Sequence, residues 1–177
     1  MELDIKLLED TINEILPGLT MVVRDVNLPE VCASKYEPGQ IIVEHGFTDA
    51  SRRVMGMITT HRYSILTNHM TDFSEFEHGT NWGIVVAQHG AHFKVMDIYE
   101  YDGKTQILLL HLPDDERWKL FQNVHLNIED DIIEDCRQHF ENKCNEEPVP
   151  ELTTTDWIAR CSMPLGMDEN GTLFPIV

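Results

Sequence analysis

Basic residues are scarce in this chain. Only 13 of its 177 residues are Lys or Arg, against 31 Asp and Glu, and the formal net charge at pH 7 is −18. Binding to nucleic acid draws much of its free energy from Lys and Arg contacts that release counterions from phosphates. The composition therefore argues against nucleic acid as a partner. It favours a basic protein surface, because opposite potentials speed the encounter of two proteins.

Long apolar runs are missing too. No stretch approaches the roughly 18 consecutive apolar residues that a membrane span requires, and the N-terminus shows no basic leader before an apolar run. We therefore expect a cytoplasmic, soluble protein with no membrane partner. A length of 177 residues suits one globular domain, so we expect a single domain over residues 1–177.

Several catalytic and metal-binding motifs are also missing. The four cysteines, at positions 32, 136, 144 and 161, form no Cys-x-x-Cys pair and no zinc-like spacing with the histidines. The chain has no Gly-rich dinucleotide turn, no phosphate loop, no Gly-x-Ser-x-Gly elbow and no EF-hand spacing. The missing motifs disfavour most nucleotide-driven enzymes. From the cysteine spacing, we expect the four cysteines to be reduced thiols.

What the chain does contain is a pattern of two hairpins over residues 82–112 that share a middle strand. Gly90-Ala91 predicts a two-residue turn between 82–89 and 92–101, and Asp102-Gly103 gives a stronger turn signal before 104–112. If each turn holds two residues, the directly opposed pairs share one face of the sheet.

This register places His89 opposite His92 and Lys94 opposite His111, and so gathers these four residues at one end of one face. Three imidazoles and a carboxylate from the acidic loop 71–81 would complete a four-coordinate shell for a divalent metal ion. Lys94 counts against a metal site, because a cation would repel its ammonium group. Half-exposed strand positions are the simpler interpretation of these histidines.

Helical spacing of apolar residues predicts three helices, at residues 3–16, 113–124 and 128–144. The remaining patterns predict a mostly antiparallel sheet of about five or six strands, so that the fold class is α+β, with the helices packed mainly on one face. From residue 146 the composition shifts to Pro, Thr and Gly. We expect residues 146–177 to form an irregular C-terminal tail that docks on the body through its apolar side chains.

Charge without a catalytic motif leads to the functional prediction. Residues 112–151 carry 12 Asp and Glu against 4 Lys and Arg, and helix 128–144 should expose Asp131, Glu134 and Asp135. We predict an acidic, non-enzymatic interaction protein, such as an inhibitor, immunity or anti-defence factor, that covers a basic protein surface with these three residues. Two alternatives stay open. One is a metal-dependent hydrolase built on His89, His92, His111 and loop 71–81, and the other is a small-molecule-binding sensor domain.

Overall fold

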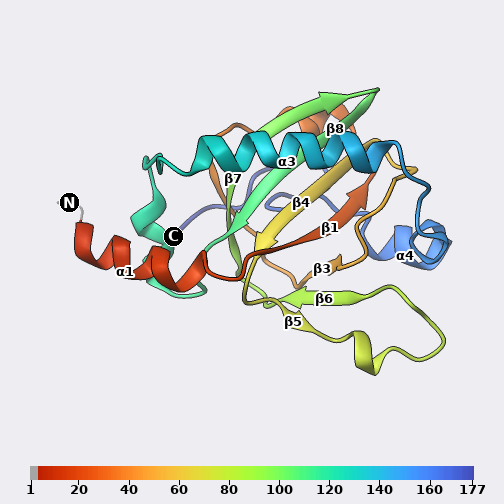
Figure 1. Ribbon diagram of the computed structural model, residues 1–177, viewed down its shortest axis with the longest axis horizontal. Coiled ribbons are helices and arrows are strands. Elements are labelled where there is room, and N and C mark those ends of the chain that lie inside the picture. The colour runs from red at the N-terminus through yellow and green to blue at the C-terminus, as the bar shows by residue number, and fades with distance from the viewer. Residues whose placement is uncertain (1–3) are drawn as a thin grey trace.

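The computed structural model describes residues 4–177 and centres on one eight-stranded sheet (Figure 1). The strands are β1 (Thr20–Val26), β2 (Ile41–Val43), β3 (Thr48–Ser51), β4 (His61–Thr67), β5 (Thr71–Asp72), β6 (Ile84–Ala87), β7 (His92–Tyr101) and β8 (Lys104–His111). The mixed α+β class is confirmed, but the predicted number of five or six strands is wrong. Strands β2, β3, β5 and β6 have only two to four residues. Runs this short do not show the period-two alternation by which a strand is recognised in a sequence.

The helices in the described residues are α1 (Ile5–Ile15), α2 (Glu30–Ala33), α3 (Glu129–Cys144) and α4 (Thr155–Arg160), with the 3-10 helices η1 (Ser74–Phe76), η2 (Glu116–Phe121) and η3 (Pro150–Thr153). The predicted helices 3–16 and 128–144 correspond to α1 and α3, with residue 3 outside the described residues. The predicted helix 113–124 is the shorter η2. The structure has more helices than the three predicted, because the others are too short for a helical period to show.

Capping and charge explain where the two long helices begin. The Asp4 side chain accepts a hydrogen bond from the Leu7 amide at 3.0 Å and so satisfies one free N–H group at the start of α1. Helix α3 has three acids in its first turn, 129–131, and Lys143 in its last turn. Both placements complement the helix dipole.

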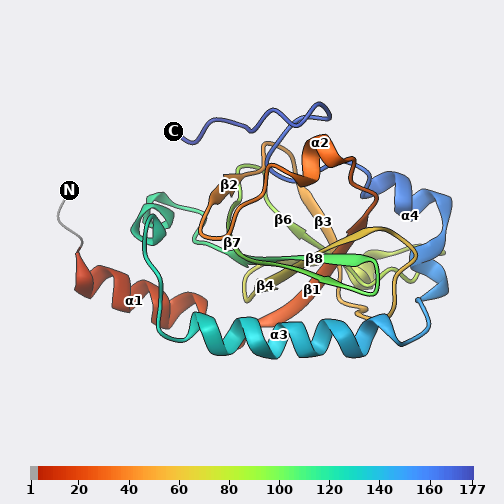
Figure 2. The same cartoon turned by 90° about the horizontal axis from the view of Figure 1, so that it is seen from above.

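The two faces of the sheet carry separate apolar cores. Helices α1 and α3 lie along one face, while α2 and the C-terminal segment lie on the other (Figure 2). The core beneath α1, α3 and η2 includes Leu8, Leu108 and Trp118, and the core of the opposite face includes Tyr63 and Phe93. The long helices thus pack on one face, and shorter segments cover the other.

Strands β4 and β8 form the one parallel pair in a sheet whose other described pairs are antiparallel, in the order β2-β7-β8-β4-β1-β3-β6-β5. Leu66 pairs with Leu110, and the next residues, Thr67 and His111, end the two strands side by side. The carboxyl ends of two segments that are distant in sequence therefore meet at one edge.

The predicted hairpin at Asp102-Gly103 is present between β7 and β8. Both turn residues have a positive φ, 50° and 74°, as a two-residue primed turn requires. A bulge between Val95 and Asp97 then shifts the register, and His111 pairs with Phe93. The predicted pairing of His111 with Lys94 is wrong, because one extra residue in a bulge moves every later pair by one position.

The predicted hairpin at Gly90-Ala91 is not formed. Strand β6 pairs with β3 and β5, whereas β7 pairs with β2 and β8. The backbone of the turn instead bonds Glu44, which accepts from the Gly90 amide at 2.8 Å and donates to the Ala91 carbonyl at 2.9 Å. The turn residues were recognised, but their long-range partners were not.

Within the predicted irregular tail, 146–177, the structure contains the short helices η3 and α4. The Trp157 side chain is buried, as are Leu165 and Met167 in the core beneath the tail. Among the described residues, no helix is long and apolar enough to cross a membrane.

Phe140 tests the inner face of α3. Its side chain is 1% exposed and lies edge-on to Tyr99 of β7, with ring centroids 6.4 Å apart. The change Phe140→Ala should lower the free energy of unfolding by about 3–5 kcal/mol, because it removes a buried ring and leaves a cavity. Chemical denaturation measures the loss. Glu134→Ala, on the exposed face of the same helix, is the control and should change stability by less than about 0.5 kcal/mol.

Candidate functional site

The three histidines predicted to form a metal cluster do not come together. His92 and Phe93 are consecutive in β7 and so point to opposite faces, and Phe93 pairs with His111. His92 therefore faces away from His111 and stacks on Trp118 with centroids 4.3 Å apart. His89 lies in the exposed turn before β7. The bulge in β7 and the unformed first hairpin are the physical causes.

The acids of the predicted loop 71–81 mainly organise the loop itself. Glu77 accepts hydrogen bonds from the amides of Trp82 at 2.7 Å and Gly83 at 3.1 Å. Asp72 accepts from the Ser74 amide at 2.8 Å and pairs with Arg52 at 2.6 Å. These two carboxylates are thus engaged within the protein.

Asp131, Glu134 and Asp135, the predicted binding residues, are exposed on α3. Their helix packs against the sheet through residues such as Cys136. The basic protein surface expected to contact them stays a prediction.

A different group of metal-ligating side chains gathers at the carboxyl ends of β4 and β8. His69 follows β4, His111 ends β8, and Asp114 lies one turn beyond. One ligand atom from each of the three residues lies within 4.8 Å of the others. The two imidazole rings stack at 15° with centroids 3.8 Å apart. His111 is the one predicted ligand that belongs to this group.

Hydrogen bonds fix the orientation of the His69 ring. The Asn68 amide nitrogen donates to the carbonyls of Glu14 at 2.8 Å and Pro17 at 3.0 Å, which leaves the amide oxygen as the acceptor facing His69. The His69 Nδ1 atom, 2.9 Å from that oxygen, is therefore the donor. In the neutral ring the Nε2 lone pair then faces the carbonyl of Leu112 at 3.2 Å.

The His111 ring is anchored in the same manner. Its Nδ1 atom lies 2.9 Å from the Thr67 hydroxyl, which also accepts from the His69 amide. Its Nε2 atom is buried, makes no hydrogen bond and lies 3.4 Å from an oxygen of Asp114. A buried polar atom without a partner costs free energy, so this nitrogen is suited to a ligand. Anchored Nδ1 and free Nε2 atoms are typical of metal-binding histidines.

Burial and charge set the protonation of the group. Burial lowers the pKa of His69, and the positive charge of a protonated His111 lowers it further. Burial alone would raise the pKa of Asp114, but the neighbouring imidazoles of His111 and His69 outweigh burial and lower it. At pH 7 the group therefore offers a neutral imidazole beside a carboxylate, which is the form that binds a metal ion.

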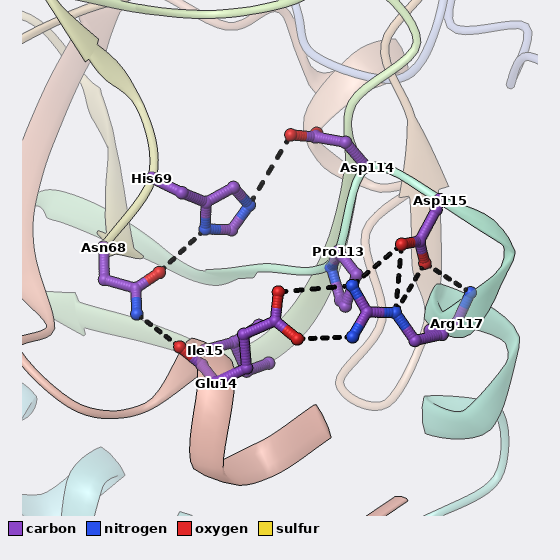
Figure 3. Close-up of a pocket in the computed structure, with 8 residues that line it drawn as sticks. All are labelled: Glu14, Ile15, Asn68, His69, Pro113, Asp114, Asp115 and Arg117. Atoms are coloured by element: carbon purple, nitrogen blue, oxygen red, sulfur yellow. Dashed lines mark hydrogen bonds and ion pairs between the residues drawn. The ribbon is translucent and has the colours of Figure 1, made fainter. Parts of the chain in front are cut away.

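A cleft of about 510 Å³ opens beside these residues, between the end of α1 and the segment after β8. Figure 3 shows the His69 ring directed toward Asp114 from one wall. On the other side Arg117 lies between Glu14 and Asp115 and pairs with both. Its charge is thus balanced by the protein. The cleft gives a small molecule access to His69 and Asp114.

His69 and Asp114 were missed at the level of sequence. The spacing His111-x-x-Asp114 is visible in the chain, but it is short and common. His69 is 42 residues away from His111 and joins it only through the parallel pairing of β4 and β8. A parallel pair without a helical crossover pattern leaves no local signal in the sequence.

No protein-family model matches the sequence, and no curated protein does. Among solved structures, the type III effector XopAI from Xanthomonas axonopodis pv. citri is similar at 18% identity over 54% of this chain and 42% of its own, with a TM-score of 0.47. The ADP-ribosyltransferase HopU1 of Pseudomonas syringae pv. Tomato is 13% identical over 53% of this chain and 45% of its own, with a TM-score of 0.48. Exoenzyme S from Pseudomonas aeruginosa is 12% identical over 66% of this chain and 57% of its own, with a TM-score of 0.47. This chain spans about half the length of these proteins.

The comparison corrects the predicted class of protein. HopU1 is described as an ADP-ribosyltransferase, as is the Vis toxin of Vibrio splendidus, and both are thus enzymes. The prediction of a non-enzymatic inhibitor, immunity or anti-defence factor is wrong by this comparison. Because the identities are below 20%, no residue role passes from these proteins to this chain.

The pH dependence of stability tests the burial of His69. Its pKa in the folded protein lies below the ordinary value of 6.5, as do those of His61, His92 and His139, in each case chiefly through burial. Below pH 6.5 the unfolded chain therefore binds more protons than the folded one, and stability falls as the pH falls.

Urea unfolding at pH 7.5, 6.5 and 5.5, in the presence of a chelator, measures this slope. The variant His69→Gln should lose less stability between pH 7.5 and 5.5 than the unmodified protein. His78→Gln, an exposed loop position, is the control and should keep the original slope. An unchanged slope in His69→Gln would contradict the assigned protonation.

Proposed function

We propose that this chain is an enzyme that binds a divalent metal ion between His69, His111 and Asp114 and uses it in the adjoining cleft. The observation that carries the proposal is the His111 Nε2 atom, which is buried and belongs to this group, and whose contact with Asp114 at 3.4 Å lacks the geometry of a hydrogen bond. The Nε2 lone pair of His69 likewise faces oxygen atoms, so that a cation relieves an otherwise unfavourable contact.

The donor set favours particular metal ions. Two imidazoles and one carboxylate suit Zn²⁺, Mn²⁺ or Fe²⁺ better than Ca²⁺ or Mg²⁺, which prefer oxygen ligands. Three protein ligands leave coordination positions for water or a substrate. The metal would lower the pKa of a bound water or hydroxyl and polarise a substrate oxygen, while the Thr67 and Asn68 side chains hold the two rings in place.

Metal titration of the purified, chelator-treated protein tests this centre. Calorimetry with Zn²⁺, together with the absorption spectrum of Co²⁺, should show one site per chain. Asp114→Asn and His69→Gln should each weaken binding by about 100-fold or more, because each removes a ligand. Affinity should also fall by at least about tenfold from pH 7.5 to 5.5, since protons compete for the imidazoles.

His92→Gln is the matched control, because His92 belongs to the same sheet but lies on its other face. Its metal affinity should equal that of the unmodified protein. Equal affinity in all four proteins would show that any bound metal lies elsewhere. Incubation of the protein with labelled NAD⁺ is a separate experiment. If the label were transferred without metal, and also by the Asp114→Asn variant, this would contradict a catalytic role for the proposed metal centre.

A further inference from the structure

A second cleft meets the first at His69. It has a volume of about 420 Å³ and shares both Asn68 and His69 with the cleft of Figure 3. His69 thus lines both clefts. A molecule that occupies the second cleft would contact His69, which belongs to the group of His69, His111 and Asp114.

Part of the lining of the second cleft is apolar. Val22 of β1 and Val85 of β6 contribute side chains from the core, and each residue is at most 4% exposed. Met21 and Met70 add two flexible thioether side chains, both partly buried against the cores. Methionine adapts its shape to irregular apolar ligands. Such a lining suits a hydrocarbon chain or a ring.

Arg52 is the one Lys or Arg residue that lines this cleft, and its ion-pair partner Asp72 lines it too. Its side chain is 55% exposed, and its one ion pair is with Asp72 through the NH1 atom. Among the hydrogen bonds of the described residues, none involves the other two guanidinium nitrogens. An exposed ion pair adds little stability, so Arg52 is free to bind an anion through two donors.

Asp72 does not depend on Arg52 for its hydrogen bonds. It also accepts from the Ser74 amide at 2.8 Å, and hydrogen bonds from Ser74 are the main cause of its lowered pKa. The carboxylate would therefore keep a partner when Arg52 turns toward a ligand. Asp72 instead acts as an internal competitor for the guanidinium.

We propose that the second cleft binds a small amphipathic anion, with its apolar part on the lining of Val22, Met70 and Val85 and its anionic group on Arg52. The role of this ligand as a substrate rests on the proposed metal centre, which shares His69 with this cleft. The binding itself does not require the metal, because Arg52 is not among the three proposed metal ligands.

Octanoate is the probe, and octan-1-ol is its uncharged counterpart. Binding is measured by chemical-shift changes in the NMR spectrum of the full chain in the presence of a chelator. Octanoate should bind at least about tenfold more tightly than octanol, since a hydrogen bond to a charged group is worth about 1.5–3 kcal/mol. Shifts should concentrate at the methyl groups of Met70 and Val85.

Three variants separate the cleft from nonspecific binding. Arg52→Gln should weaken octanoate binding by about tenfold and leave octanol unchanged. Asp72→Asn should strengthen octanoate binding a few-fold, because it removes the competitor for Arg52. Arg53→Gln is the matched control, as Arg53 pairs with Glu151 and lines no part of this cleft, and its affinity should be unchanged.

Equal binding of octanol and octanoate, or equal loss in the Arg52 and Arg53 variants, would overturn the proposal. Octanoate binding in a protein that binds no metal would leave this inference standing and remove only the proposed function. Metal binding without octanoate binding would remove this inference and leave the proposed function standing.

Discussion

The parallel pairing of β4 with β8 is the contact on which the candidate site depends. It joins segments about 44 positions apart in the chain and brings Thr67 beside His111 at the edge where both strands end. His69 follows directly and stacks on His111. Parallel strands end at the same edge, so that side chains from both segments converge there without any local signal. The antiparallel pairs of the sheet could not place these two carboxyl ends together.

Desolvation gives the site its chemical character. His111 is 1% exposed, and burial keeps His69 neutral at pH 7 beside the ionised Asp114. The anchored Nδ1 atoms leave both Nε2 atoms directed at this carboxylate. A strongly acidic protein attracts cations, and the buried lone pairs select where one would bind. The second cleft, which His69 also lines, adds space for a ligand next to this residue.

The acidic composition, by contrast, says little about activity. Charge predicted a basic partner for Asp131, Glu134 and Asp135, and these residues are indeed exposed on α3. Exposed charge is equally a property of enzymes, because it governs solubility and encounter rather than fold or chemistry. The prediction of a non-enzymatic protein, made from charge, was wrong, and the metal ligands proposed above lie at and after the carboxyl ends of β4 and β8 instead.

The sequence by itself determined the features that depend on near neighbours. These are the mixed α+β class, helices α1 and α3, and the turn at Asp102-Gly103, whose residues tolerate a positive φ. Tertiary structure decided the bulge after Val95, the partners of β6 and the pairing of β4 with β8. Register and strand partners follow from how whole faces pack, and a shift of one residue moves a side chain to the other face. The three predicted histidines were therefore separated, and His111 stacks instead on His69, which only the folded chain brings near.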